Sequence, residues 1–128
     1  MSEGERALAI QESGQMYLET ILVLSKKSSA VRAIDVAEHM KYTKPLVSRA
    51  MHLLQKNGYI DIDGNGFITL KPSGRAIAES ILDRHETISK LLMSIGVNES
   101  TAVDDACRVE HYISEETFAA IKRACEHI

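Results

Sequence analysis

A short segment in the middle of the chain, YIDIDGNGFITL, constrains the fold more than any other. Two runs of mainly β-branched and aromatic residues, 59–62 and 67–70, flank the turn sequence DGNG. Asp-Gly and Asn-Gly pairs favour tight hairpin turns because their backbone reaches positive φ at little cost. The segment is therefore predicted to form a two-stranded β-hairpin. The apolar residues expected to pair across it are Tyr59, Ile60 and Ile62 with Phe67, Ile68 and Leu70.

Three amphipathic segments precede the hairpin, and apolar residues recur in each at intervals typical of a helix. The first begins near Ser13, a suitable N-cap, and ends near the lysines at 26–27. The second, AVRAIDVAEHM, is joined by the tripeptide KYT to the third. Thr43 can cap the third helix, Pro45 fits its first turn, and Gly58 can end it. The residues predicted to face the core are Tyr17, Leu18, Ile21, Leu22, Leu24, Ile34, Val36, Ala37, Met40, Val47, Ala50, Met51 and Leu54.

Two short helices, a three-residue turn and a following hairpin are the elements of a winged helix-turn-helix, whose second helix can enter the major groove of DNA. The chain carries a net charge of −3, yet Lys26 to Lys56 holds seven basic and two acidic residues, a net +5. Clustered cations bind phosphate whatever the total charge, although a basic segment can also be solvated surface. We therefore expect a DNA-binding domain at 1–72 with double-stranded DNA as its partner. The candidate contact residues are Thr43, Lys44, Pro45, Ser48, Arg49 and Lys56.

The second part of the chain, residues 73–128, is predicted to be wholly helical. It contains a long helix over 73–95, a shorter one starting at Asn98 or Ser100, and a last one capped by Ser114. A helical region behind a wing commonly supplies a dimer surface, because two-fold operators require two-fold proteins. The expected fold class is therefore mainly α, with an N-terminal winged helix-turn-helix, a two-stranded β wing and an all-α dimerisation domain. The protein is predicted to form a homodimer.

The motif CRVEH in this second part places a thiol, a carboxylate and an imidazole at Cys107, Glu110 and His111. On a helix, intervals of three and four bring side chains to one face, so three metal-binding groups are predicted to converge. In isolation, the same pattern is also typical of a buried thiol, a solvated acid and a hydrogen-bonded imidazole. Donors on other helices favour metal binding. These are Met16 and Glu19, three residues apart on the first helix, and His85 on the long helix.

The order of the elements, together with QMYLETI, LKPSGR, RHE and DDACRVEHYIS, resembles the diphtheria-toxin-repressor family of metal-dependent transcriptional repressors. The resemblance covers the chain from about Gly14 to Ile128. The length is similar to that of the manganese-transport-regulator branch, which lacks the SH3-like third domain of the iron branch. The resemblance implies a repressor, not an enzyme, that binds operator DNA as a dimer when metal is bound and controls metal-uptake genes.

The resemblance also implies the metal ligands. The iron branch uses a Met on the first helix and a C-x-x-E-H motif, which correspond here to Met16, Cys107, Glu110 and His111. In the manganese branch an Asp replaces that Met and a Glu replaces that Cys. A further Glu and a His of that branch match Glu19 and His85, so the chain combines both patterns. It departs from the iron branch at the ancillary site, where Val103 and Ser89 stand in place of a His and a Glu.

The softness of these ligands predicts the metal. Manganese prefers oxygen and imidazole donors, whereas thiolate and thioether sulfur favour later, softer ions. Met16 and Cys107 therefore favour Fe²⁺, with Mn²⁺ as the alternative effector. Zn²⁺, Co²⁺ and Ni²⁺ are expected to bind in vitro as well.

Other classes of protein fit the sequence less well. A metalloenzyme would need an open coordination position in a substrate cleft and a catalytic base, and no nucleophile–base pair or phosphate-binding glycine loop is present. We therefore expect no enzymatic activity and no organic substrate. A metal-independent winged-helix regulator remains an alternative. The two cysteines, the lack of an apolar leader and the lack of a long apolar run predict a protein of the reducing cytoplasm without a membrane partner.

Overall fold

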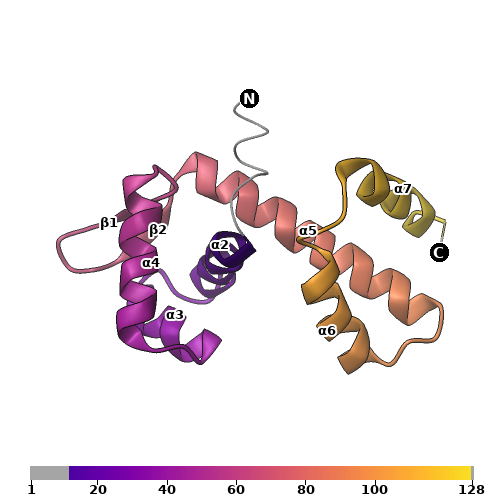
Figure 1. The fold of residues 1–128 in the computed structure, drawn as a ribbon, viewed down its shortest axis with the longest axis horizontal. Helices are drawn as coiled ribbons and strands as arrows, with labels where there is room; N and C mark the ends of the chain where they lie inside the picture. Colours follow the sequence, from indigo (N-terminus) through magenta and orange to yellow (C-terminus); the bar gives the residue numbers. More distant parts are fainter. Residues whose placement is uncertain (1–11, 128) are drawn as a thin grey trace. The chain divides into compact units, whose positions relative to one another are not determined.

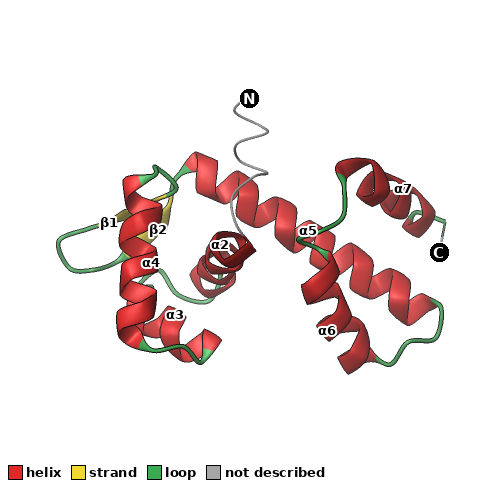
Figure 2. Ribbon diagram, in the orientation of Figure 1, coloured by secondary structure: helices red, strands yellow, loops and turns green. Residues whose placement is uncertain are grey.

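The computed structural model describes residues 12–127 and is mainly helical, as predicted (Figure 1). This part of the chain contains six α-helices and one two-stranded antiparallel sheet (Figure 2). The chain forms two compact units, residues 1–79 and 80–128. The predicted division after residue 72 falls at the start of a long helix, and the assignment of 1–72 and 73–128 as separate functional domains stays a prediction.

The first unit contains three helices, a hairpin and the start of a fourth helix. The elements are α2 (Glu12–Ser25), α3 (Ala33–Met40), α4 (Lys44–Lys56), β1 (Ile60–Ile62), β2 (Ile68–Leu70) and the first turns of α5 (Pro72–Ser94). Helix α2 packs against α3 and β2, α3 packs against α4, and α4 packs against β1. This is the predicted order of a winged helix-turn-helix.

Most of the predicted apolar stripes form the core of this unit. The predicted residues that are buried are Tyr17, Leu18, Ile21, Leu22, Val36, Ala37, Val47, Met51 and Leu54. The prediction for Ile34 is wrong, because its side chain is 40% exposed. Helix α3 turns Val36 and Ala37 inward, and a residue two positions before Val36 points about 200° away from it. Ile34 therefore lies on the outer face of a short helix.

The turn between α3 and α4 follows the predicted tripeptide. Lys41 ends α3 in the left-handed conformation, with φ 60°, and its amide bonds to the carbonyl of Ala37. Thr43 is the N-cap of α4 in an extended conformation, although its side chain makes no capping hydrogen bond. Pro45 lies in the first turn, where a missing amide costs nothing, and Gly58 follows the helix with φ +81°.

The hairpin is present, with Ile60 opposite Leu70 and Ile62 opposite Ile68, but its strands are shorter than predicted, and Tyr59 and Phe67 lie outside them. The carboxylate of Asp63 closes its turn by accepting hydrogen bonds of 2.9 Å from the amides of both Asn65 and Phe67. Asp at the first position of DGNG thus organises the turn that the glycines allow. A hydrogen bond of 2.7 Å from the Ile68 amide to the Val31 carbonyl attaches the wing to the segment before α3.

Gly74, in the first turn of α5, lies against the start of the wing. A Cβ atom at this position would collide with the carbonyl oxygen of Tyr59 and would also crowd the side chain of Leu18. The obstructing atom belongs to the backbone and cannot rotate away. Only glycine therefore allows α5 to begin so close to β1.

The second unit contains the rest of α5 together with α6 (Glu99–Val109) and α7 (Glu115–Cys125). Both predicted caps are confirmed. The Asn98 side chain accepts a hydrogen bond from the Ser100 amide at 3.0 Å, and the Ser114 hydroxyl accepts one from the Thr117 amide at 3.1 Å. These bonds satisfy amides that have no partner within the helix and so define where α6 and α7 begin.

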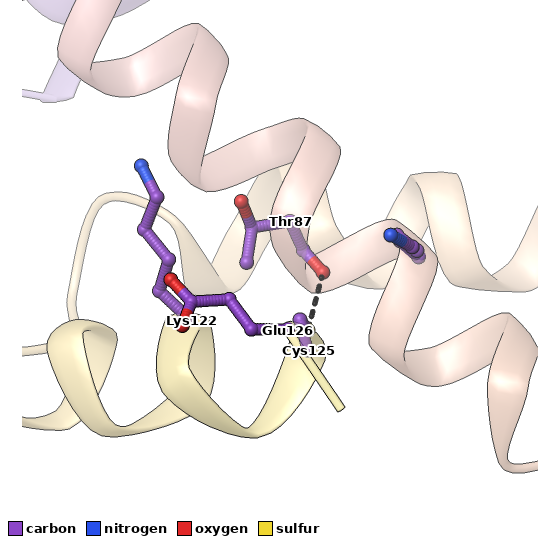
Figure 3. A pocket seen from close by; sticks show the side chains of 5 residues that line it. Thr87, Lys122, Cys125 and Glu126 are labelled. Atoms are coloured by element: carbon purple, nitrogen blue, oxygen red, sulfur yellow. Dashed lines mark hydrogen bonds between the residues drawn. The ribbon is translucent and has the colours of Figure 1, made fainter. Parts of the chain in front are cut away.

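Two polar contacts hold α7 against α5. Lys122 Nζ lies 2.6 Å from a carboxylate oxygen of Asp83, and this hydrogen bond raises the pKa of Lys122. The buried thiol of Cys125 lies 3.7 Å from the carbonyl oxygen of Thr87, beside a pocket that Lys122 and Glu126 also line (Figure 3). Cys125 is thus a packing residue of α7.

Among the described helices, none is both long enough and apolar enough to span a lipid bilayer.

Candidate functional sites

The outer face of α4 carries the residues predicted to contact DNA. Val47, Met51 and Leu54 turn inward, so the opposite side of the helix is left for solvent. Of the predicted residues, five are exposed and one is half-buried; these are Thr43, Lys44, Pro45, Arg49 and Lys56, with Ser48 partly covered. The helix contains three cations and no carboxylate. Its exposed face is therefore positively charged and offers hydroxyl and guanidinium donors near the N-terminus.

A further exposed cation, Arg32, lies next to the wing. Its guanidinium is 4.4 Å from the centre of the Phe67 ring, and its amide is bonded to the carboxylate of Asp35 at 2.8 Å. Arg32 was not among the residues predicted from the sequence. A basic residue directly before α3 was visible there, but its pairing with an aromatic residue 35 positions later was not. It extends the basic surface of this unit from α4 to the wing.

Four of the six predicted metal ligands come together in the second unit. Glu110 lies at their centre with only 1% of its side chain exposed. One of its carboxylate oxygens is 2.9 Å from Nδ1 of His85 on α5, and the other is 3.4 Å from Nε2 of His111. The sulfur of Cys107, in the last turn of α6, is 3.7 Å from the same Nδ1 of His85. His85 thus links the thiol of Cys107 to the carboxylate of Glu110, whose other oxygen lies beside His111.

The local backbone of this cluster differs from the predicted continuous helix. Helix α6 ends at Val109, so Glu110 is its C-cap residue and His111 follows in a turn. Glu110 nevertheless keeps helical dihedral angles, φ −57° and ψ −24°. The side chains of Cys107 and Glu110 therefore still project as neighbours one turn apart, even though the regular helix has ended. Cys107 is exposed and Glu110 is buried.

The remaining two predicted ligands belong to the first unit. Met16 and Glu19 lie three residues apart on α2 and both are partly exposed. Neighbours at this spacing share one face of a helix. Their participation in a metal site together with the four residues of the second unit stays a prediction.

The donor set around Glu110 fits a divalent transition-metal ion. Neutral imidazole, carboxylate and thiolate are the ligands that such ions take in proteins, and a histidine whose ring nitrogen bonds to a carboxylate is common in metal centres. Ser89, one of the two positions where the sequence departs from the iron-type ancillary site, is buried, and its hydroxyl oxygen lacks a hydrogen-bond partner among the described residues. The absence of an iron-type ancillary site stays a prediction.

The backbone that carries Glu110 and His111 is held by Arg84, which the sequence did not single out. Arg84 is buried on α5, and its Nη1 donates to the carbonyl oxygens of Glu110, at 3.3 Å, and Ile113, at 2.8 Å. The ring of Phe118 on α7 lies 5.3 Å from the guanidinium carbon. The only sign of Arg84 in the sequence is its position next to His85. Its acceptors are backbone atoms 26 and 29 residues away, which sequence patterns do not reveal.

Comparison with known protein families gives two adjoining matches. Residues 9–66 match the N-terminal DNA-binding domain of the iron-dependent repressors, and residues 71–128 match the metal-binding and dimerisation domain of the same repressors. The two matches together include α4 and the cluster around Glu110.

Individual relatives agree with these matches. The diphtheria toxin repressor of Corynebacterium efficiens is 28% identical over 106 residues, which are 82% of this chain and 46% of the relative. The HTH-type transcriptional regulator MntR of Geobacillus thermodenitrificans is 30% identical over 98 residues, which are 77% of this chain and 70% of the relative. The chain therefore spans about half the length of the diphtheria toxin repressor that it matches.

A solved structure described as a manganese-dependent transcriptional repressor in complex with manganese is also similar. Its TM-score is 0.80 and its sequence identity is 25%, over 88% of this chain and 52% of that one. The likeness extends across both the winged helix-turn-helix elements and the helices that follow them.

Proposed function

Because the chain belongs to the family of metal-dependent transcriptional repressors that includes the diphtheria toxin repressor and MntR, we propose that it is a DNA-binding repressor controlled by a divalent metal. In this proposal the protein binds operator DNA as a homodimer when metal is bound, and its targets are metal-uptake genes. The effector is Fe²⁺, with Mn²⁺ as the second candidate.

The observation that carries the proposal is the buried carboxylate of Glu110 between His85 and His111, with the thiol of Cys107 3.7 Å from His85. A bound divalent ion would supply the positive charge that offsets the thiolate and the carboxylate. Without it, Glu110 is satisfied by the two imidazoles. His85 and His111 thus keep the carboxylate oriented, and the same side chains offer nitrogen donors to a cation.

Sulfur donors support Fe²⁺ over Mn²⁺. The exposed thiol of Cys107 and the thioether of Met16 are ligands that Mn²⁺ binds poorly compared with the ions that follow it in the first transition series. Mn²⁺ remains the second candidate because the relatives include MntR and a manganese-dependent repressor solved with manganese. Glu19 and His85, which match ligands of the manganese branch, also favour it.

The homodimer is supported by apolar side chains of the second unit that meet solvent. These are Met93, Ile95, Val109 and Tyr112, whose exposed fractions run from 37% to 73%. Large apolar side chains that meet solvent in this way suit burial against a second copy. Two copies present two α4 helices, which must meet successive major grooves about 34 Å apart. If bound metal raises the affinity for DNA by favouring that spacing, bound DNA must raise the affinity for metal by the same factor.

The proposal is tested by an anaerobic titration of metal-free protein with Fe²⁺ and, separately, with Mn²⁺. The readout is the fluorescence anisotropy of a labelled DNA duplex from the region upstream of the protein's own coding sequence. We expect tight binding at a lower concentration of Fe²⁺ than of Mn²⁺, and release on addition of a chelator. Binding that is equal with and without metal would contradict metal control and favour a metal-independent regulator. Equal binding to a random duplex would contradict operator recognition.

Two substitutions on α4 should separate base reading from phosphate contact. Arg49 lies near the start of the helix and can form a bidentate contact with a guanine, so Arg49→Ala should cost about 1–3 kcal/mol on the operator and little on random DNA. Lys56 lies in the last turn and suits a phosphate, so Lys56→Ala should weaken binding to both sequences and lower the slope of log affinity against log salt by about 1. Equal losses on both sequences for Arg49→Ala would exclude its role in base recognition.

A further inference from the structure

We infer that Arg84 is a positioning residue of the metal centre, which holds the segment Glu110–Ile113 in its metal-binding shape before any metal is present. The inference rests on the proposed function, because it concerns the same cluster of ligands. Arg84 itself contributes no donor to a cation, since its guanidinium is permanently charged. Its role would be exerted through the backbone.

Both hydrogen bonds of Arg84 reach the backbone just after α6. The last carbonyl groups of a helix have no partner within that helix. One guanidinium nitrogen of Arg84 donates to the carbonyls of Glu110 and Ile113, which both lie in the segment between α6 and α7. Glu110 and His111 belong to this segment. Arg84 therefore ties it to α5 at two points.

Neighbouring residues of α5 hold the same ligand, Glu110, in two ways. Arg84 bonds to the backbone oxygen of Glu110, and His85 contacts its carboxylate at 2.9 Å. The main chain and the side chain of Glu110 are thus both bonded to one stretch of helix α5. A displacement of the segment would move Glu110 and His111 together, away from His85.

Burial of Arg84 carries a cost in free energy. Only 6% of the residue is exposed, and its Nε has no hydrogen-bond partner among the described residues. Burying a guanidinium is unfavourable unless its hydrogen bonds are made, and a neutral side chain of similar length would fill the space without this cost. The contact with the Phe118 ring offsets part of it. A side chain without these donors would fill the space but could not hold the segment in place.

The test compares Arg84→Met, which keeps the length of the side chain and removes its donors, with Lys122→Met. Lys122 is a matched control because it also lies over the Phe118 ring, at 5.8 Å, but is bonded to Asp83 instead of the segment. The first readout is the visible absorption of Co²⁺ during titration of the metal-free dimer. We expect Arg84→Met to bind Co²⁺ about 10- to 100-fold more weakly, the range found when residues that orient metal ligands are lost, and Lys122→Met to bind it like the unaltered protein.

The second readout is amide hydrogen exchange of the metal-free protein. The amides of Tyr112 and Ile113 bond to the Val109 carbonyl, at 3.0 and 3.3 Å, and they should exchange faster in Arg84→Met and remain unchanged in Lys122→Met. Unchanged Co²⁺ affinity or unchanged exchange in a folded Arg84→Met variant would overturn the inference. An Arg84→Lys variant, which can donate to one carbonyl at a time, serves if Arg84→Met does not fold. Intermediate Co²⁺ affinity would support the inference, and affinity equal to that of the unaltered protein would overturn it.

The two proposals fail in different ways. If the unaltered protein does not bind Co²⁺, Fe²⁺ or Mn²⁺, the proposed function is wrong and the inference is overturned with it. If the unaltered protein binds metal and Arg84→Met binds it equally well, only the inference is overturned. Arg84 acts on the position of the metal ligands and not on their identity. Its loss should therefore lower the affinities for Fe²⁺ and Mn²⁺ by the same factor.

Discussion

Replacement of Glu110 by glutamine should raise the metal concentration needed for DNA binding by more than about 100-fold. Glu110 supplies the one carboxylate that two imidazoles contact in the cluster, and the neutral amide removes its charge with little change in shape. The measurement is the same DNA anisotropy titration with Fe²⁺. Glu110→Ala should have at least as large an effect, but it also removes the side chain that His85 and His111 contact and leaves a buried space, so the glutamine variant is the cleaner test.

Glu79→Gln is the control for this experiment. Glu79 lies on α5, more than half exposed, in an ion pair of 3.5 Å with Arg75, and a pair of this kind contributes little to stability. The control should therefore behave like the unaltered protein in metal response, in DNA affinity and in thermal unfolding. A normal metal response in Glu110→Gln would show that Glu110 is not a metal ligand. The proposed function would then lose its central observation.

Replacement of both sulfur ligands by carboxylates should reverse the preference between metals. In the double variant Met16→Asp and Cys107→Glu, oxygen donors stand where the thioether and thiol stand now, and Mn²⁺ favours such donors. We expect the ratio of the Mn²⁺ and Fe²⁺ concentrations at half-maximal DNA binding to fall by about tenfold or more, a change of about 1.4 kcal/mol in relative affinity. The measurement is a pair of anaerobic titrations on one operator duplex.

The other cysteine provides the control for the sulfur argument. Cys125 is buried on α7 with its sulfur beside the carbonyl of Thr87, so Cys125→Ser should leave the metal preference unchanged even if it lowers stability. An unchanged Mn²⁺ to Fe²⁺ ratio in the double variant would show that the preference does not depend on sulfur. The choice of metal would then have to come from the geometry of the oxygen and nitrogen donors.

The parts of the fold that could be predicted from the sequence are those that depend on neighbouring residues. The hairpin at DGNG and the caps at Asn98 and Ser114 follow from local backbone chemistry, and each is present. Ile34 was misplaced because α3 is only eight residues long, and so short a segment contains too few apolar positions to define its buried face.

The candidate site was predictable in its residues but less so in its geometry. The interval between Cys107 and Glu110 brings their side chains together whether or not the helix continues, so the early end of α6 at Val109 left the cluster intact. Arg84 could not be predicted, because its partners are carbonyl groups, which every residue possesses. Only the fold decides which of them lie within its reach.

The close approach of Gly74 to Tyr59 also limits how this sequence can diverge. Any mutation of the Gly74 codon that changes the amino acid introduces a Cβ atom against a main-chain carbonyl, whatever metal or operator the protein has come to use. Arg75, the next residue, is exposed and carries no such restriction. Among chains that share this architecture, the glycine of LKPSGR should therefore persist while the residue beside it drifts, which makes it a marker of ancestry independent of the metal ligands.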